Sequence, residues 1–256
     1  MNRLFDLSGR VAVVVGGTSG IGRALAVGLA DAGADVVATG RRADLVQSVA
    51  AEIEMRGRRT LRQPADATDR ATLARLRTAT LAAFGAVDIL VCAAGITKRV
   101  PTLQMADDDW DAILATNLTG TLNACRVFGA GMVERGSGRI ITIASLASQV
   151  GFMEVVPYAA SKAGVAGLTR ALAVEWAPNN VTVNAIAPGV FRTDLNANLI
   201  DSPRGQELLM RTPMRRFGRV EELVGAAVFL ASDAASFVTG TVLAVDGGFL
   251  ASGVNQ

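Results

Sequence analysis

The sequence of 256 residues contains no histidine, one tyrosine and only two cysteines. Without histidine the chain cannot form a Ser-His-Asp triad, use a histidine general base or build a histidine-rich zinc site. Cys92 and Cys125 are too few for a cysteine metal cage, so we predict no metal site. They also provide no disulfide framework, which favours the reducing cytoplasm as the location of the protein.

Long hydrophobic runs and one-sided charge are missing as well. No uncharged run reaches 18 consistently apolar residues, so a membrane span is not expected. The first six residues carry charges and have no apolar signal core. The 25 basic residues are scattered among 23 acids, with no basic stripe for nucleic acid. We therefore expect a small-molecule partner, and neither nucleic acid nor membrane.

Half of the residues are hydrophobic, which suits one large α/β domain spanning residues 1–256. Short β-rich runs alternate with Ala/Leu-rich helical stretches, and this pattern predicts a doubly wound parallel sheet of the Rossmann type with helices on both faces. The predicted strands are 11–15, 35–39, 61–63, 88–92, 139–144, 181–187 and 242–245. The predicted helices are 20–31, 43–56, 69–84, 107–116, 118–134, 158–176 and 221–231. Residues 189–218, rich in Asn, Pro, Gly and Arg, are expected to form a mobile substrate lid.

A glycine-rich turn joins the first predicted strand to the first predicted helix. Its glycines follow the spacing Gly-x3-Gly-x-Gly, which differs from the commoner dinucleotide fingerprint Gly-x-Gly-x-x-Gly. Glycines let the backbone approach a pyrophosphate, and the helix N-terminus supplies free N–H groups. The turn therefore predicts a dinucleotide site that includes Gly16, Thr18, Ser19, Gly20, Ile21 and Gly22.

The residues after the second and third predicted strands bear on the choice of nucleotide. Arg41 and Arg42 follow the second strand, where an acid would indicate NAD and an arginine accommodates the 2′-phosphate of NADP. This favours NADP(H), although NAD(H) remains open because both could be ordinary surface arginines. Asp66, after the third strand, is placed to meet an adenine amine or to cap the next helix.

The single tyrosine, Tyr158, lies four residues before Lys162, one of two lysines in the chain. Residues i and i+4 share one face of a helix, so the phenol and the ammonium are expected side by side. A neighbouring positive charge lowers the pKa of a phenol from about 10. Such a group can exchange a proton with an alcohol oxygen at neutral pH. A surface tyrosine beside a solvated lysine would show the same spacing.

With Gly-x3-Gly-x-Gly and Tyr-x3-Lys together, the chain resembles the short-chain dehydrogenase/reductase family from Leu7 to Phe249. The resemblance extends to Asn117, to Ser145 and to the stretches Pro188-Gly189-x3-Thr193 and Asp246-Gly247-Gly248. It implies a seven-stranded parallel sheet and a homotetramer. The helices 118–134 and 158–176 carry small apolar residues, as expected if some faces are buried between subunits.

The resemblance also implies roles for individual residues. Tyr158 would be the general acid/base, and Lys162 would lower its pKa and hold the nicotinamide ribose. Ser145 would bond the substrate oxygen, and Asn117 would hold a water in a proton relay to Lys162. Further cofactor contacts are implied at Ala67, Ala93, Ala94, Gly95, Pro188, Gly189, Val190 and Thr193.

Two positions depart from the family's pattern. Val15 replaces the usual threonine before the first glycine, and Cys92-Ala93-Ala94-Gly95 stands where the family has Asn-Asn-Ala-Gly. Both changes remove side-chain hydrogen bonds that brace the cofactor pocket. Neither affects a proton-transfer residue, so the expected reaction class is unchanged.

Basic residues mark the expected substrate side. Lys98 and Arg99 resemble the branch of the family that contains gluconate 5-dehydrogenases and 2-deoxygluconate 3-dehydrogenases, which handle sugar acids. Together with Arg192 they could bind a substrate carboxylate, or they could be charges at a rim or interface. Phe152, between Ser145 and Tyr158, is expected to line the substrate pocket.

These features lead to three hypotheses. The first is an NADP(H)-dependent oxidoreductase that interconverts a secondary alcohol and a ketone on a sugar acid such as gluconate. The second is a 3-oxoacyl-carrier-protein reductase, although no compact basic patch for an acidic carrier is visible. The third is a non-catalytic NADP-binding regulatory subunit, which would have no need of Asn117, Ser145, Tyr158 and Lys162.

Overall fold

The computed structural model describes residues 3–193 and 201–253. Six parallel strands form one sheet in the order β2-β1-β3-β4-β5-β6. Every residue of β1, β3, β4 and β5 is buried, which explains their continuous apolar sequence. The strands are β1 (Val11–Val15), β2 (Asp35–Thr39), β3 (Ile89–Cys92), β4 (Gly138–Ile143), β5 (Val181–Pro188) and β6 (Val242–Val245).

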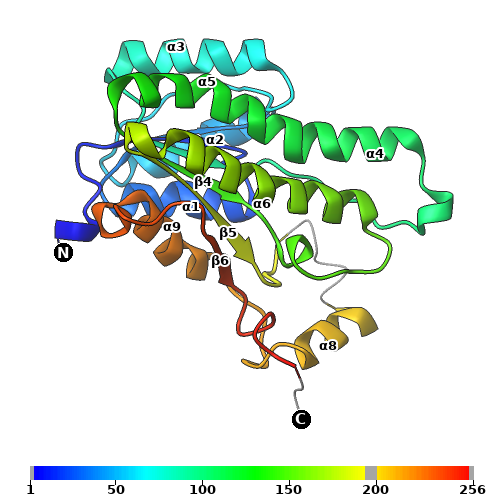
Figure 1. Cartoon of the computed structure of the whole chain (residues 1–256). Helices are drawn as coiled ribbons and strands as arrows, with labels where there is room; N and C mark the ends of the chain where they lie inside the picture. The colour runs from blue at the N-terminus through cyan, green and yellow to red at the C-terminus, as the bar shows by residue number, and fades with distance from the viewer. Residues whose placement is uncertain (1–2, 194–200, 254–256) are drawn as a thin grey trace.

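Helices cover both faces of this sheet (Figure 1). One hydrophobic core joins α1 (Gly20–Asp31), α2 (Ala43–Glu54) and α9 (Val224–Ala231) to the sheet. A second core, on the other face, joins α3 (Arg70–Phe84), α5 (Gly120–Arg135) and α6 (Val156–Trp176). Two layers of helices with the sheet between them confirm the predicted doubly wound class. The remaining described α-helices are α4 (Asp107–Leu114) and α8 (Pro203–Met210).

The predicted strand at 61–63 is not formed, so the described sheet has six strands where the family resemblance implies seven. The chain nevertheless runs alongside β2: the carbonyl oxygen of Arg59 accepts from the N–H of Val36, and the N–H of Ala65 donates to Gly40. Between these two bonds Pro64 has no N–H to donate. A regular ladder is therefore interrupted at the edge of the sheet.

The two helices predicted at 107–116 and 118–134 form one continuous helical run. They are joined by a five-residue π-turn, Ala115–Thr119, which contains Asn117. A π-turn inserts a residue into the helix and leaves a break in its hydrogen-bond ladder, and such turns are frequent at functional sites. The sequence showed no sign of this turn.

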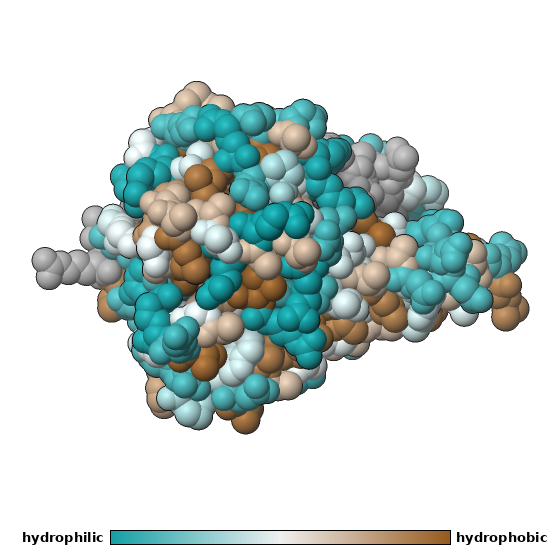
Figure 2. All heavy atoms as spheres, turned by 90° about the horizontal axis from the view of Figure 1, so that it is seen from above, coloured by the Kyte–Doolittle hydropathy of each residue, from teal (hydrophilic) through white to brown (hydrophobic). Residues whose placement is uncertain are grey.

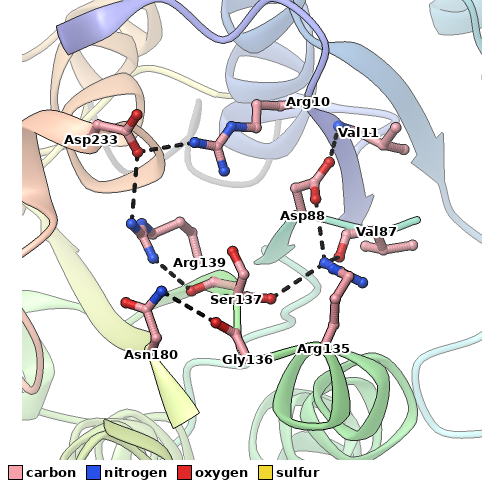
Figure 3. A network of polar contacts seen from close by, with 11 residues as sticks. Arg10, Val11, Val87, Asp88, Arg135, Gly136, Ser137, Arg139, Asn180 and Asp233 are labelled. Carbon is pink, nitrogen blue, oxygen red and sulfur yellow. Dashed lines mark hydrogen bonds and ion pairs between the residues drawn. The ribbon is translucent and has the colours of Figure 1, made fainter. Parts of the chain in front are cut away.

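The amino edge of the sheet is closed by a polar network (Figure 3). Asp88 accepts a hydrogen bond of 2.9 Å from the N–H of Val11, and Arg135 donates to the carbonyl oxygen of Val87 at 2.9 Å. Arg139 is buried beside Asp233, and burial lowers the pKa of this arginine. These contacts fix the beginnings of β1, β3 and β4, and leave the opposite edge for ligands.

The predicted lid, residues 189–218, begins directly after β5. Its two ends lie together, because Phe191 pairs with Gly218 and the N–H of Gly218 donates to Val190. Helix α8 lies within it, and residues 194–200 lie outside the described residues. Its proposed closure over a ligand stays a prediction.

The surface seen in Figure 2 mixes hydrophilic and hydrophobic residues, with no single continuous hydrophobic band across that face. None of the helices within the described ranges is long and apolar enough to cross a membrane.

Candidate active site

The predicted site residues follow the carboxyl ends of neighbouring strands. Gly16 follows β1, Arg41 follows β2, Ala93 follows β3 and Ser145 follows β4. Because the strands are parallel and paired in register, these ends meet at one edge of the sheet. This is the edge where ligands bind in open α/β sheets.

The glycine turn packs too closely for side chains. Gly16 has φ +82°, and a Cβ there would lie 2.4 Å from the backbone nitrogen of Ala94. A Cβ on Gly22 would lie 2.0 Å from the carbonyl oxygen of Gly16. Helix α1 then begins at Gly20, and its N-cap Ser19 makes no side-chain capping bond. The first N–H groups of α1 are therefore available for an anionic ligand, as expected for a pyrophosphate site.

The loop after β5 reaches the same turn. A Cβ on Gly20 would lie 3.6 Å from Cγ2 of Thr193, so the two segments face each other. Gly189 packs against Asp246, where a Cβ would lie 2.7 Å from the Asp246 Cα. Of the predicted contacts, Thr193 thus lies beside the glycine turn, whereas Pro188, Gly189 and Val190 lie at the carboxyl end of β5.

The end of β2 presents two exposed cations. The side chains of Arg41 and Arg42 make no hydrogen bond or ion pair with any described residue. Many other arginines in the structure hold a carboxylate, as Arg23 holds Glu52 at 2.7 Å. The two guanidiniums at the end of β2 are therefore free to bind an anionic ligand group.

Asp66 and Ala67 lie between β2 and α3. The N-cap of α3 is Asp69, whose side chain accepts from the backbone N–H of Ala71, so the capping role considered for Asp66 falls to Asp69. Asp66 Oδ1 accepts two hydrogen bonds from Thr68. Ala67 is buried against Gly120, where a Cβ would lie 3.0 Å from the Ala67 Cβ.

Tyr158, Lys162 and Ser145 come together where α6 crosses the end of β4. The amine of Lys162 lies 5.7 Å from the centroid of the Tyr158 ring. Lys162 is buried and donates a hydrogen bond of 2.7 Å to the carbonyl oxygen of Ile143, the last residue of β4. The Ser145 hydroxyl accepts from the N–H of Ala147 at 3.1 Å and lies near enough to Tyr158 to influence the pKa of its phenol.

Burial governs the titration of this cluster. It lowers the pKa of Lys162 to about 8, because the charged amine loses its hydration. It raises the pKa of Tyr158, and hydrogen bonding with Ser145 opposes that rise. The sequence predicts that Lys162 lowers the pKa of Tyr158. In the structure burial raises the pKa of Tyr158 overall and Ser145 opposes that rise, while the effect of Lys162 on the phenol stays a prediction.

Asn117 uses its side-chain amide to hold neighbouring backbone. Its Oδ1 accepts from the N–H of Ile96 at 2.8 Å, and its Nδ2 donates to the carbonyl oxygen of Ile96 and to Ser161. A Cβ on Gly95 would lie 3.5 Å from Asn117 Oδ1 and 3.6 Å from Lys162 Nζ. Asn117 therefore fixes the loop after β3 beside Lys162, and its expected role in a water relay stays a prediction.

Phe152, predicted to line the substrate pocket, is half-buried. Its ring packs against that of Phe249 in a tilted arrangement, with ring centroids 6.1 Å apart.

The cations predicted to bind substrate are each paired with an acid. The ion pairs are Lys98 with Asp109, Arg99 with Glu154 and Arg192 with Asp201. A substrate carboxylate at any of them would have to compete with a protein carboxylate.

Sequence reasoning missed three residues of this region. Ser161 bonds Asn117 and donates to the carbonyl oxygen of Tyr158 at 2.7 Å. Glu154 adopts φ +65°, a conformation that glycine favours. Because the residue there is a glutamate, the sequence did not indicate this backbone conformation. Arg204, on α8, lies 4.0 Å from Glu154, a contact between segments 50 residues apart.

The arrangement has the parts needed for proton exchange with an alcohol or a carbonyl oxygen. Tyr158 and Ser145 each offer a hydroxyl, and Lys162 provides a buried cation beside them. The free N–H groups of α1 and the two unpaired arginines lie along the same edge. A dinucleotide and a small hydroxylated substrate both fit this edge of the sheet.

Comparison with known proteins gives consistent matches over the whole chain. Residues 15–250 match a family described as enoyl-(acyl carrier protein) reductase. A gluconate 5-dehydrogenase from Gluconobacter oxydans is 40% identical over 250 residues, which cover 97% of this chain and 98% of the relative. A D-threitol dehydrogenase from Mycolicibacterium smegmatis is 40% identical over 247 residues, 96% of this chain and 94% of the relative.

Solved structures agree with these matches. A gluconate 5-dehydrogenase from Burkholderia cenocepacia, in complex with NADP and tartrate, has a TM-score of 0.94 at 38% identity and covers 98% of this chain and 99% of its own. A putative NAD(P) dependent gluconate 5-dehydrogenase from Beutenbergia cavernae, with bound NADP, has a TM-score of 0.91 at 49% identity. The match covers 97% of this chain and 100% of that structure's chain. The expected resemblance is confirmed, and this chain belongs to the short-chain dehydrogenase/reductase family.

Proposed function

We propose that this protein is an NADP(H)-dependent oxidoreductase that interconverts a secondary alcohol and a ketone on a sugar acid. The observation that carries the proposal is the meeting of Tyr158, Ser145 and buried Lys162 beside the glycine turn of β1. Two relatives, 40% and 37% identical to this chain, are named for gluconate and 5-keto-D-gluconate, which supports an enzyme acting on CH–OH groups.

The residues present fit the dinucleotide. Gly16 and Gly22 leave no room for a Cβ, so backbone lines the place where a pyrophosphate would approach. Arg41 and Arg42 are free to take the 2′-phosphate that distinguishes NADP from NAD. Solved relatives with bound NADP bear out this cofactor class. Lys162 would hold the ribose of the nicotinamide half.

The mechanism assigns a task to each residue of the cluster. When bound, the nicotinamide supplies or accepts the hydride. Tyr158 gives its phenolic proton to the ketone oxygen, or takes the proton of the alcohol in the reverse direction. Ser145 hydrogen-bonds the same substrate oxygen and, through Tyr158, keeps the phenol from becoming too weak an acid. Lys162 supplies a positive charge that favours the phenolate.

The runner-up function is reduction of a 3-oxoacyl carrier-protein thioester. The description of the matching family, which refers to acyl carrier protein, favours it. The relatives named for sugar acids favour the first function. A neutral polyol is a third substrate to include, because one relative is named for D-threitol.

Turnover followed at 340 nm tests the proposal. The purified protein is assayed with NADP(H) and NAD(H) against gluconate, 5-ketogluconate, D-threitol and a 3-oxoacyl thioester. We expect turnover with the sugar acids and a preference for NADP(H). Tyr158→Phe should lose turnover while it still binds NADPH. Unchanged turnover in Tyr158→Phe would remove the assigned acid/base, and thioester-only activity would replace the proposed substrate with the runner-up.

We also propose that the protein assembles as a homotetramer. Support comes from α6, whose outward positions include exposed Ala160, Ala163 and Val174. A helix face of small apolar residues can pack closely against a second helix. Light scattering on the purified protein would measure a mass of four chains, and the mass of one chain would contradict the proposal.

A further inference from the structure

Glu154, on the loop between Ser145 and Tyr158, is the acid in a cluster with two cations from other segments, Arg99 and Arg204. Arg99 binds the carboxylate of Glu154 through its Nε. Arg204, from α8, lies with its Nη1 4.0 Å from the same carboxylate. Two guanidiniums therefore share one carboxylate, and the cluster carries a net charge of one positive.

One guanidinium nitrogen of Arg204 has a hydrogen-bond acceptor and another does not. Its Nη2 donates a hydrogen bond of 3.1 Å to the carbonyl oxygen of Met153. Its Nη1 is shielded from solvent and has no hydrogen-bond acceptor in the described part of the chain. Buried donors nearly always have an acceptor, so this nitrogen is a position where an acceptor is missing. The tight partner of Glu154 is Arg99, which leaves Arg204 with the loose contact.

The cluster adjoins the segment between Ser145 and Tyr158. Met153 and Glu154 belong to the segment that leads from Ser145 to Tyr158, and Glu154 is four residues before Tyr158. The carbonyl oxygen of Glu154 accepts from the N–H of Val100, so the loop after β3 is joined to the same cluster. In Figure 1, α8 lies near the loop that leads into α6, beyond the carboxyl end of β5.

We propose that Arg204 binds the carboxylate of the substrate and thereby determines the preference for acids. The proposal rests on the proposed function, because it names the residue that recognises the acid group of that substrate. The side chain keeps 19% exposure, so its guanidinium is not sealed off from a ligand that arrives from solvent. A planar guanidinium matches a carboxylate geometrically, and its charge remains at any working pH.

Arg204 differs in this respect from the cations that the sequence had suggested. Lys98 and Arg192 hold their own acids at 2.7 Å and 3.1 Å, and both are more than half exposed. An exposed, paired cation gains little from exchanging one carboxylate for another. The shielded Nη1 of Arg204, which has no acceptor in the described part of the chain, gains a hydrogen bond that it lacks.

The test compares 5-ketogluconate with its neutral carboxamide, using NADPH and the variants Arg204→Ala and Arg204→Lys. Arg211→Ala is the matched control, because Arg211 follows the same helix and pairs with Glu207 in solvent. We expect Arg204→Ala to raise KM for the acid by about tenfold or more and to leave KM for the carboxamide unchanged. Arg204→Lys should give an intermediate KM for the acid, because it keeps the charge and loses the fork.

A second measurement does not depend on turnover. Tartrate, a dicarboxylate, is titrated into the protein with NADP bound, in the same set of variants. We expect Arg204→Ala to weaken tartrate binding by about tenfold or more, and Arg211→Ala to leave it unchanged. Glu154→Gln should tighten tartrate binding, because it removes the competing carboxylate. Unchanged NADPH binding in Arg204→Ala shows that the variant is folded.

The outcomes separate this proposal from the proposed function. If the wild type prefers the acid and Arg204→Ala keeps that preference, Arg204 is not the carboxylate site although the sugar-acid function stands. If the wild type turns over neither acid nor carboxamide, but tartrate binds in an Arg204-dependent way, the function fails and the anion site stands. If tartrate binding does not depend on Arg204, the proposal is overturned.

Discussion

The amine of Lys162 donates a 2.7 Å hydrogen bond to the backbone carbonyl oxygen of Ile143. This bond ties α6 to the last residue of β4, two residues before Ser145. The amine is buried, and its pKa falls to about 8 from the usual 10.5 because charge is costly there. Lys162 is therefore charged below pH 8 and loses its proton as the pH rises through 8.

The first prediction concerns cofactor affinity and pH. Lys162 is proposed to hold the ribose of an anionic dinucleotide, and such a complex favours the charged amine. The Kd of NADPH should be constant below about pH 7 and rise above about pH 8, by up to about tenfold per pH unit, since binding then requires proton uptake. Fluorescence titration from pH 6.5 to 9.5 measures this. Lys162→Met should bind more weakly and show no rise, and an equal rise in that variant would assign it to another group.

The second prediction concerns the two unpaired arginines after β2. The double substitution Arg41→Ala, Arg42→Ala should weaken NADP by at least about tenfold, because charge-assisted bonds to the 2′-phosphate are lost. The Kd of NAD should change little, since NAD lacks that phosphate. The two dissociation constants are measured by titration on the same preparations. Equal weakening of both cofactors would contradict the 2′-phosphate assignment.

The third prediction concerns the packing of the glycine turn. Gly16→Ala should lower the free energy of unfolding by about 3 kcal/mol, because it combines strain at positive φ with a clash against backbone. A Cβ there meets the nitrogen of Ala94 at 2.4 Å. Gly57→Ala is the matched control, since Gly57 has φ +70° and nothing within 4 Å of a built Cβ. Gly57→Ala should lower the free energy of unfolding by about 1 kcal/mol. Chemical denaturation measures both, and similar losses would show that the clash is relieved by movement.

The fourth prediction concerns the polar network at the amino edge. Asp88→Ala leaves the buried N–H of Val11 without its acceptor and should lower the free energy of unfolding by about 2 kcal/mol. Asp88→Asn keeps an oxygen in the same place and should lose less than about 1 kcal/mol. Urea denaturation of the wild type, Asp88→Ala and Asp88→Asn measures the three free energies of unfolding. The comparison is valid if the three proteins have the same m-value. An equal loss in both variants would assign the effect to the ion pair with Arg135.

Local pattern was sufficient for much of the fold. The predicted limits of α1, β1, β2 and β6 agree residue for residue with the structure. Apolar runs and glycine turns are local signals, and they specify these elements without reference to the rest of the chain. The missing strand near residue 62 and the π-turn at Asn117 depend on neighbouring segments, so the pattern could not show them.

The sequence by itself determined the family and its reaction class, because Gly-x3-Gly-x-Gly and Tyr-x3-Lys are short-range patterns with a direct chemical meaning. Only the tertiary structure decided which cations are free. Lys98 and Arg99 are paired with acids that lie 11 and 55 residues away, whereas Arg204 carries a donor without an acceptor. Charge balance depends on distances in space, and residues far apart in the chain become neighbours only through the fold.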